Sequence, residues 1–391
     1  MVVQVSVSML LLIGAGLLVR TLLNLQRVDT GFNENNLLLF TVDPGLIGYK
    51  DDRLANLYQQ MTERVEAMPG VTTATFSQMP LLSFMSSNRF FFLPGARQGG
   101  DGRFIASGDV YTQVVRENFL TAMQIPLLAG RQWTAHDDSR APKMAVINQT
   151  FARRYFPNEN PIGKRFGFDS RKQDEIEIIG LTKDAKYTSQ REEVPATVYL
   201  SWLQDLHSVG QVTYEVRTTG DPNTVVNGIR QAVREVDPKL PLKDIKTQIE
   251  QADETLMMER LFAKLLSLFG LLAQQLASIG LYGVLAWSVS QRTHEIGIRM
   301  ALGANRSRVL QMILRQGMTL ALIGIALGLA GAYVLTKYLE SLTTMLYGVQ
   351  PRDPLTYGVA AGLLSLVAVF ACFVPARRAA KVDPLVALRY E

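Results

Sequence analysis

Four long apolar runs constrain the fold of this chain more than any other feature of its sequence. They lie at residues 2–19, 261–290, 317–336 and 355–374. A helix that crosses the hydrocarbon core of a bilayer needs about 20 mostly apolar residues, and each run is long enough. The last two runs contain no charged residue, which disfavours the alternative of buried helices in a soluble protein. The pattern therefore predicts four transmembrane helices.

The composition adds a water-exposed part to this membrane protein. Of the 391 residues, 48% are hydrophobic and 19% are charged, which is too many charges for a chain embedded wholly in lipid. The first run has no basic residue before it and no small-residue cleavage site after it. We therefore expect a membrane anchor and not a signal peptide. The missing basic lead suggests that the chain is a piece of a longer protein.

The distribution of Lys and Arg indicates the orientation, because these residues collect on the cytoplasmic side of a membrane. The loop at residues 291–316 has five arginines and one acid, and the tail at residues 375–391 has four basic and two acidic residues. Both are predicted to be cytoplasmic, together with the N-terminus, which leaves residues 29–260 outside. That outer segment has 26 basic and 30 acidic residues, in line with this assignment, whereas Arg20 and Arg27 fall on the wrong side.

The outer segment is long enough for its own core and for two lobes. Near each of its ends, at residues 35–80 and 211–247, a helical apolar pattern lies between two strand patterns. The second of these helices begins with Asp221 as its N-cap, followed by proline. We predict an α-helical membrane protein of four spans with a large α+β domain between the first two. An insertion of roughly residues 85–205 would form the second lobe of that domain.

The sequence lacks the residue patterns of common catalytic and metal sites. The stretch NENPIGKRF has Asn158 where a phosphate-binding loop requires its first glycine, and HEIGI lacks the second histidine of a zinc-binding helix. The three histidines are far apart in the sequence. Cys372, the single cysteine, lies in an apolar run and is expected to pack as a small hydrophobic residue. We expect no catalytic residue, no cofactor and no metal site.

Small and polar residues in the apolar runs predict close helix packing. The G-x-x-x-G pairs, which let two helix backbones approach, are Gly324 with Gly328 and Gly358 with Gly362. Gln274 and Gln275 are costly against lipid, so we expect them to face another helix, with a local bend or a wet cavity as the alternative. As a helix, residues 261–290 would be about 45 Å long, so one end should extend outward as a stalk.

The basic loop after the second run, SVSQRTHEIGIRMALGANRSRVLQMILRQ, has helical periodicity. Its polar stripe recurs at steps of three and four residues and consists of Arg292, Glu295, Arg299, Gly303 and Arg306. Glu295 is placed to pair with Arg299, and the apolar face consists of Ile298, Ala301 and Leu302. A break at Gly303 precedes Asn305, which can cap the next helix. Charge alone leaves two interpretations open: a docking surface for a partner, or an interfacial helix retained by anionic lipid.

Longer motifs in the sequence resemble those of a known family. RTHEIGIRMALGANRSRVLQMIL resembles the signature cytoplasmic loop of FtsX-like and MacB-like ABC transporter permeases, and VPARRAAKVDPLVALRYE resembles their C-terminal tail. NENPIGKRF and LLAGRQW resemble parts of the MacB-type periplasmic core domain. The resemblance covers the chain in order: a first transmembrane helix at 1–28, a periplasmic core at 29–260 and an FtsX-like domain at 261–391.

This resemblance implies which partners the protein has and where it binds them. The loop would be a coupling helix that docks on a separate cytoplasmic ABC ATPase subunit through Arg292, Glu295, Ile298, Arg299, Leu302 and Gly303. No ATPase domain is fused to this sequence, so ATP hydrolysis is expected on the partner, and the chain itself is not expected to be an enzyme. The chain looks most like one half of the duplicated eight-span permeases, which implies pairing with a second copy or a homologous half.

The expected location is the bacterial inner membrane, with both termini in the cytoplasm, the large domain in the periplasm and no nucleic acid as partner. Two functions stay open. The chain is either the membrane subunit of an ABC-type export or mechanotransmission system for a hydrophobic or peptide-like substrate, or a non-transporting receptor or scaffold. The latter would regulate a periplasmic partner such as a cell-wall hydrolase.

Overall fold

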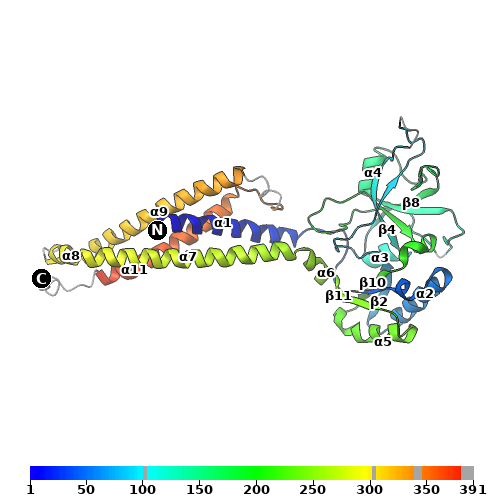
Figure 1. The fold of residues 1–391 in the computed structure, drawn as a ribbon, viewed down its shortest axis with the longest axis horizontal. Coiled ribbons are helices and arrows are strands. Elements are labelled where there is room, and N and C mark those ends of the chain that lie inside the picture. The colour runs from blue at the N-terminus through cyan, green and yellow to red at the C-terminus, as the bar shows by residue number, and fades with distance from the viewer. Residues whose placement is uncertain (100–103, 135, 302–304, 339–345, 380–391) are drawn as a thin grey trace. The chain divides into compact units, whose positions relative to one another are not determined.

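The computed structural model describes residues 1–391 except 100–103, 135, 302–304, 339–345 and 380–391. The chain divides into two compact units, whose elements are labelled in Figure 1. The helical unit consists of Met1–Arg27 and Met257–Glu391, and the sheet unit consists of Val28–Leu256. Each unit is described by itself.

The strands of the sheet unit form one mixed sheet, with a main path in the order β11-β1-β10-β2-β4-β9-β6-β8-β5. The first four strands on this path come from the two ends of the segment: β1 (Leu37–Val42), β2 (Val71–Ser77), β10 (Val212–Thr218) and β11 (Leu242–Thr247). Helix α2 (Asp51–Glu66) connects β1 to β2, and α5 (Val226–Val236) connects β10 to β11. Because β10 pairs antiparallel with both β1 and β2, the two predicted strand–helix–strand units interlock as a split β-α-β pair.

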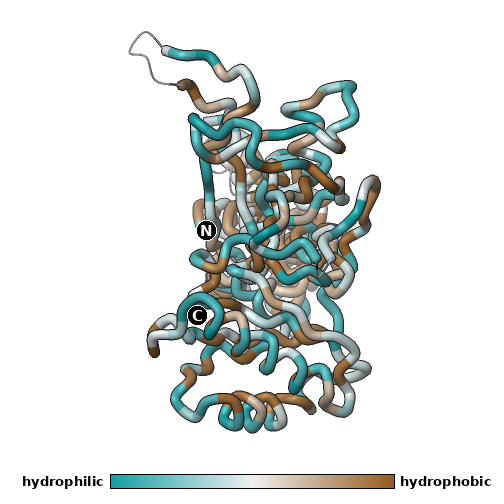
Figure 2. Tube along the Cα trace, turned by 90° about the vertical axis from the view of Figure 1, so that its right-hand side faces the viewer, coloured by the Kyte–Doolittle hydropathy of each residue, from teal (hydrophilic) through white to brown (hydrophobic). Residues whose placement is uncertain are grey.

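Both connecting helices are amphipathic, as the sequence pattern predicts. α2 buries Leu54, Leu57, Tyr58, Met61, Thr62 and Val65. Figure 2 shows hydrophobic and hydrophilic residues alternating along α5, which lies at the bottom of that view. Asp221 accepts a hydrogen bond from the backbone N–H of Asn223 (3.0 Å) and caps a 3-10 turn, η4 (Pro222–Val225), that leads into α5. The local sequence pattern of capping and amphipathic residues therefore predicts these two helices well.

The other strands come from the middle of the segment and lie within the predicted insertion. They are β3 (Asn88–Phe91), β4 (Gly108–Val115), β5 (Leu127–Gly130), β6 (Lys143–Asn148), β7 (Arg165–Phe166), β8 (Ile176–Thr182) and β9 (Thr197–Ser201). Two short helices accompany them, α3 (Phe119–Met123) and α4 (Gln149–Tyr155). The register between β2 and β4 has one paired position, Ser77 with Val115. The two lobes therefore share one sheet through a narrow junction.

Buried side chains cover both faces of this sheet. On the face with α2 and α5, the rings of Phe40 and Tyr214 stack with centroids 4.9 Å apart, and Phe76 packs beside Tyr214 at 5.4 Å. The other face packs against α3 and against α6 (Gln248–Thr255), whose Ala252 belongs to the second buried cluster. Thr247 and Glu250 form a capping box that starts α6.

Four helices in the described part of the helical unit are long and apolar enough to cross a membrane. They are α1 (Val2–Leu25), α7 (Met257–Gln291), α9 (Arg306–Tyr338) and α11 (Pro354–Ala379). Each helix contains one of the predicted apolar runs, which confirms the prediction of four apolar spans. α7 has 35 residues, so it is about 52 Å long at the rise of an α-helix.

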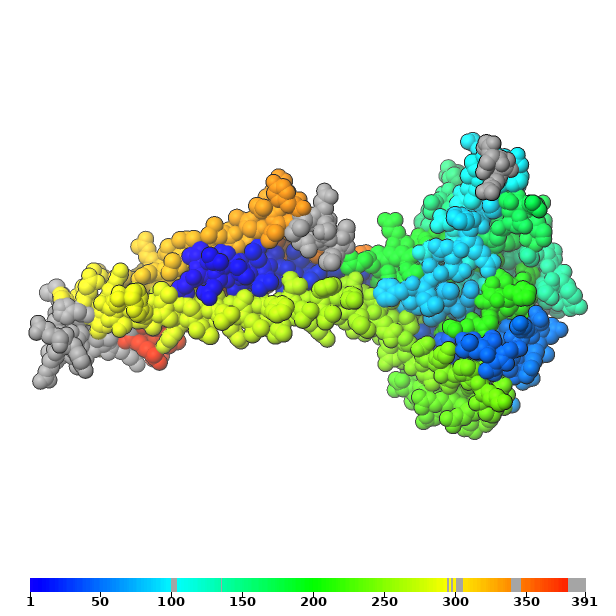
Figure 3. Space-filling view, in the orientation of Figure 1, coloured from blue at the N-terminus to red at the C-terminus, as the bar shows by residue number. Residues whose placement is uncertain are grey.

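Within the helical unit, α1 contacts α7, α9 and α11. Figure 3 shows α1, in blue, between α9, in orange, and α7, in yellow-green. The side chains buried at these contacts are Val5, Met9, Ile13 and Leu17 of α1 with Ala277, Ile325, Ala332, Ala360 and Leu364. Only 28% to 33% of each span is buried inside the unit. The remaining apolar surface points outward, as expected of helices surrounded by lipid.

Candidate functional site

A short helix, α8 (Thr293–Ala301), lies between α7 and α9 in the chain and carries the basic stretch identified in the sequence. The hydroxyl of Thr293 lies 3.0 Å from the carbonyl oxygen of Val289, so the first residue of α8 is tied to the last turns of α7. The side chains of Arg292, Glu295 and Arg299 are exposed. α8 therefore presents the predicted polar stripe to its surroundings.

Ile296 anchors α8 to the helical unit, a role that the sequence pattern did not identify. Its side chain is 3% exposed and belongs to a buried cluster with Leu281 and Leu285 of α7 and Val309 of α9. Ile298, which the pattern assigned to the apolar face, is 40% exposed. Residues two apart lie on nearly opposite sides of a helix. One isoleucine therefore holds α8 in place, and the other is available on the outer side.

The remaining predicted contact residues lie at the end of α8 and beyond. Arg299 Nη1 lies 3.4 Å from Met312 Sδ. Among the described residues, Arg299 does not form the predicted ion pair with Glu295. Leu302 and Gly303 lie outside the described residues.

α9 begins at Arg306, directly after Asn305, and Arg306 and Arg308 are exposed. Together with Arg292 and Arg299, they are exposed arginines on and beside α8.

Gly324 and Gly328 lie where α9 meets α1. A Cβ placed on Gly324 would lie 2.6 Å from Val5 Cβ, and one on Gly328 would lie 2.5 Å from Met9 Cβ. Atoms cannot approach so closely without a shift, so any side chain here would push the two helices apart. The short separation also brings the hydroxyl of Ser6 within 2.9 Å of the carbonyl oxygen of Gly324, the same distance as to that of Val2 in its own helix.

The second glycine pair and the two glutamines lie in different surroundings. A Cβ on Gly358 or Gly362 would meet no heavy atom within 4 Å in the described chain. Gln274 is 7% exposed, and its Oε1 has no hydrogen-bond partner among the described residues, whereas Gln275 is exposed. The described residues do not pack against Gly358 or Gly362, and Gln275 is exposed, so packing of these three residues against a helix stays a prediction.

Arg20, one of the two arginines on the wrong side for the charge rule, has a partner. It forms an ion pair with Asp353, whose carboxylate also accepts from the backbone N–H (2.8 Å) and the hydroxyl (2.6 Å) of Thr356. The hydroxyl of Thr356, and then Arg20, lower the pKa of Asp353 to about 2. The ion pair compensates the charge of Arg20 next to the start of α11.

Buried amide side chains hold α6 in the sheet unit, just before α7 begins. Gln248 Nε2 donates to the carbonyl oxygen of Leu81 (3.1 Å), and Gln251 Nε2 donates to that of Leu82 (2.8 Å). From another segment, Gln190 Nε2 donates to a carbonyl oxygen of α6 (3.1 Å). Bonds of this kind are costly to break when the groups are buried. They fix the segment that leads directly into α7.

Glu215, on β10, is a fully buried carboxyl group. Its Oε1 lies 2.5 Å from Ser77 Oγ, and Ser77 Oγ lies 2.7 Å from the carbonyl oxygen of Met79. A serine hydroxyl has one hydrogen, and a carbonyl can only accept. A Ser77 that donates to Met79 can therefore bond to Glu215 only if Glu215 is protonated. Burial raises the pKa of Glu215 to about 8.

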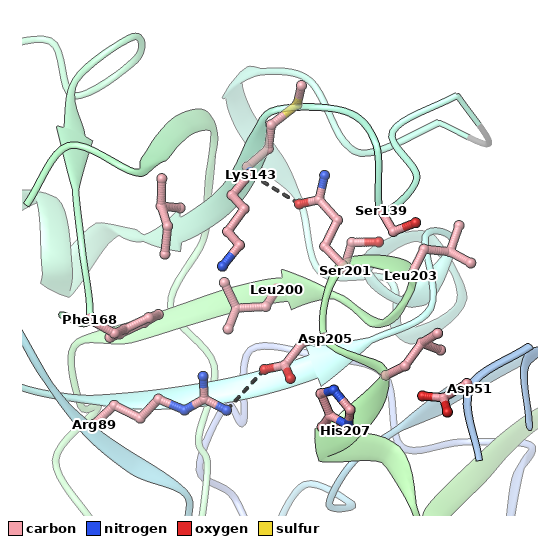
Figure 4. Close-up of a pocket in the computed structure, with 14 residues that line it drawn as sticks. Asp51, Arg89, Ser139, Lys143, Phe168, Leu200, Ser201, Leu203, Asp205 and His207 are labelled. Carbon is pink, nitrogen blue, oxygen red and sulfur yellow. Dashed lines mark hydrogen bonds and ion pairs between the residues drawn. The ribbon is translucent and has the colours of Figure 1, made fainter. Parts of the chain in front are cut away.

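A pocket of about 370 Å³ lies in the sheet unit (Figure 4). Its lining comes from the starts of β6 and β8, the end of β9 and the turn that follows β9. The side chains that matter for its chemistry are Arg89, Lys143 and His207, with Phe168, Ile176 and Leu200. Asp51 and Asp205 also line it, so the pocket combines charged groups of both signs with an apolar wall, a composition found in small-molecule sites. No feature of the sequence pattern pointed to it, because its residues are far apart in the chain.

Among the described residues, no group of three His, Cys, Asp or Glu side chains is arranged to hold a metal ion. Cys372 is buried in the cluster that contains Ile296, where it packs beside apolar side chains.

Comparison with known proteins gives matches along almost the whole chain. Residues 4–232 match the MacB-like periplasmic core domain, and residues 267–384 match the FtsX-like permease C-terminal region. A macrolide export ATP-binding/permease protein MacB from Azoarcus sp. (strain BH72) is 24% identical over 375 residues, which cover 90% of this chain and 51% of that protein. The chain therefore spans about half the length of this relative.

Two further matches are to another permease and to a periplasmic region of the same kind. An uncharacterized ABC transporter permease, YknZ of Bacillus subtilis (strain 168), is 25% identical over 297 residues, which cover 72% of this chain and 70% of that protein. The crystal structure of the periplasmic region of MacB from Actinobacillus actinomycetemcomitans is 14% identical, with a TM-score of 0.39, and covers 59% of this chain and 98% of that one.

Proposed function

Because this chain belongs to the MacB/YknZ-type ABC transporter permeases, inner-membrane proteins with a periplasmic domain, we propose that it transmits the motion of a cytoplasmic ATPase to that domain. In this role it is the membrane subunit of an export or mechanotransmission system. ATP hydrolysis takes place on a separate ABC subunit that docks on α8. The substrate class that we assign is hydrophobic or peptide-like.

The position of Ile296 is the observation that carries this proposal. Ile296 is buried among residues of α7, α9 and α11, whereas the arginines around it are exposed. A partner that binds the exposed side of α8 and moves would therefore displace the core at this end of the helical unit. α7 is a continuous helix of 35 residues, and a rigid helix transmits displacement along its length. Its first turn follows α6, which buried amides hold in the sheet unit.

Ile298→Asp tests the docking surface. A helix on a partner's surface gains much of its affinity from an apolar anchor, and a carboxylate at an apolar contact is costly. We expect the variant, purified in mild detergent from its native host, to retain about tenfold less nucleotide-binding subunit and ATPase activity than the unchanged protein. Leu128→Asp is the matched control, because Leu128 of β5 is 48% exposed and lies in the sheet unit, away from α6 and α8 in the chain.

Ile296→Ala separates docking from transmission. The truncated side chain leaves the outer surface of α8 unchanged but loosens its anchor, so the ATPase should still bind while its stimulation falls. Equal and mild effects of Ile298→Asp and Leu128→Asp would contradict the docking proposal and favour an interfacial helix retained by lipid.

The proposed orientation places α8 in the cytoplasm and the sheet unit in the periplasm. Cysteines introduced by Asn305→Cys and Glu159→Cys should react oppositely with a membrane-impermeant thiol reagent in intact cells. Both positions are exposed, and the native Cys372 is buried. In cells with a permeable outer membrane, we expect labelling at position 159 alone. Labelling at position 305 from outside would reverse the orientation.

The second candidate function is a non-transporting scaffold that regulates a periplasmic partner. It predicts a stable complex with a periplasmic protein, no associated ATPase and no effect of the α8 variants. The exposed arginines on and beside α8 favour the coupling function, because a scaffold acting only in the periplasm has no use for a cytoplasmic docking helix.

A further inference from the structure

Two cationic side chains, Arg89 and Lys143, line one end of the pocket in the sheet unit, and each has a carboxylate partner. Arg89 Nη2 donates to Asp205 (3.0 Å) and Ser208 (2.9 Å), while Nη1 and Nε make no hydrogen bond in the described chain. Lys143 Nζ pairs with Glu175 at 2.9 Å. An ammonium group has three hydrogens, so two of them stay available. Figure 4 shows both side chains at the end of the pocket where Phe168 lies.

The wall beside these cations is apolar. Leu200 and Ile176 are 7% and 4% exposed, and both line the pocket. The ring of Phe168 lies with its centroid 5.4 Å from the guanidinium carbon of Arg89. A flat apolar surface next to unused N–H donors suits a ligand with an anionic end and an apolar body.

We propose that this pocket binds an amphipathic anion, a carboxylate joined to an apolar chain or ring. The carboxylate accepts hydrogen bonds from Arg89 and Lys143, and the apolar body lies against Leu200 and Phe168. A volume of about 370 Å³ is near the lower end for small-molecule sites. Of the two carboxylates that line the pocket, Asp205 is paired with Arg89, and Figure 4 shows Asp51 at the opposite end from Phe168. Ligand binding here goes beyond the coupling function and does not depend on it.

Two small probes of equal shape test the charge preference. Hydrocinnamate carries a carboxylate on a phenylethyl body, and hydrocinnamide carries a neutral amide instead. Titration calorimetry on the full chain in lipid nanodiscs should give hydrocinnamate about tenfold tighter binding than hydrocinnamide, because charge-assisted hydrogen bonds are about twice as strong as neutral ones. Equal binding of the two probes would overturn the proposal.

Three variants locate the site. Lys143→Gln should bring the two probes to nearly equal affinity. Lys172→Gln is its matched control and should change nothing, because Lys172 also faces Glu175 (3.7 Å) but does not line the pocket. Ser139→Trp should fill the pocket and abolish binding of both probes without touching the cations. The same effect from both lysine variants, or binding unchanged by Ser139→Trp, would show that the probe binds elsewhere.

Discussion

Gly328→Leu is expected to break the packing of α1 against α9. A Cβ at this position would lie 2.5 Å from Met9 Cβ and 3.0 Å from the carbonyl oxygen of Ser6, so the two helices must move apart. Overpacking of a close contact costs about 3 kcal/mol, and here it also moves the hydroxyl of Ser6 away from the carbonyl oxygen of Gly324, now 2.9 Å from it. Thermal unfolding in mild detergent should show a large fall in the midpoint and aggregation at lower temperature.

Gly362→Leu is the matched control, because the same side chain on another span would meet no heavy atom within 4 Å. It should leave the midpoint of the isolated chain nearly unchanged. If the two variants have the same stability, the close approach of α1 and α9 is wrong. If Gly362→Leu keeps the monomer folded but prevents association with a second copy, the second glycine pair acts between chains.

The four spans could be predicted because their signal is local. Apolar length decides whether a helix can cross a bilayer, and each run contains that information by itself. The ends of the helices could not be predicted in the same way. α9 begins at Arg306, well before the apolar run at residue 317, because arginines and glutamine are good helix formers and continue the helix outside the apolar core.

The four strands near the ends of the sheet unit could also be predicted, but the strands of the middle part and the order of all of them could not. β1 and β2 flank α2 in sequence, yet β10, from residues far along the chain, lies between them. The pattern of a strand shows which of its residues are buried but not which strand it pairs with. Periodicity therefore cannot predict pairing between strands that are far apart in the sequence. The pocket was missed for the same reason, since Arg89 and Lys143 belong to different strands.

For α8, the sequence pattern predicted the helix but not which of its faces is buried. Ile296 and Ile298 are both apolar, and either could face the core of a short helix. The structure buries Ile296 and exposes Ile298. The tertiary contacts with Leu285 and Val309 decide between the two, and no local rule contains that information.

Raising the pH from about 6 to about 8 is expected to destabilise the sheet unit through Glu215. Burial raises the pKa of this carboxyl group from 4.5 to about 8, so the folded state keeps a proton that the unfolded chain releases. The stabilisation is complete below the unfolded value and is lost as the pH rises toward the folded value. The free energy of unfolding should fall by up to about 1.4 kcal/mol per pH unit, or by about 2 kcal/mol over this window.

Glu215→Gln is the variant that isolates this carboxyl group from the other titrating groups. Its amide can donate to Ser77 in place of the protonated acid and cannot ionise, so the contact toward Met79 is kept while the proton linkage is removed. Unfolding followed by the fluorescence of Trp133 and Trp202, with Trp287 replaced by phenylalanine, should then depend less on pH than in the unchanged chain. Both tryptophans are buried in the sheet unit. If the two proteins lose stability equally over this window, Glu215 is ionised in the folded state, and Ser77 must donate to its carboxylate and not to Met79.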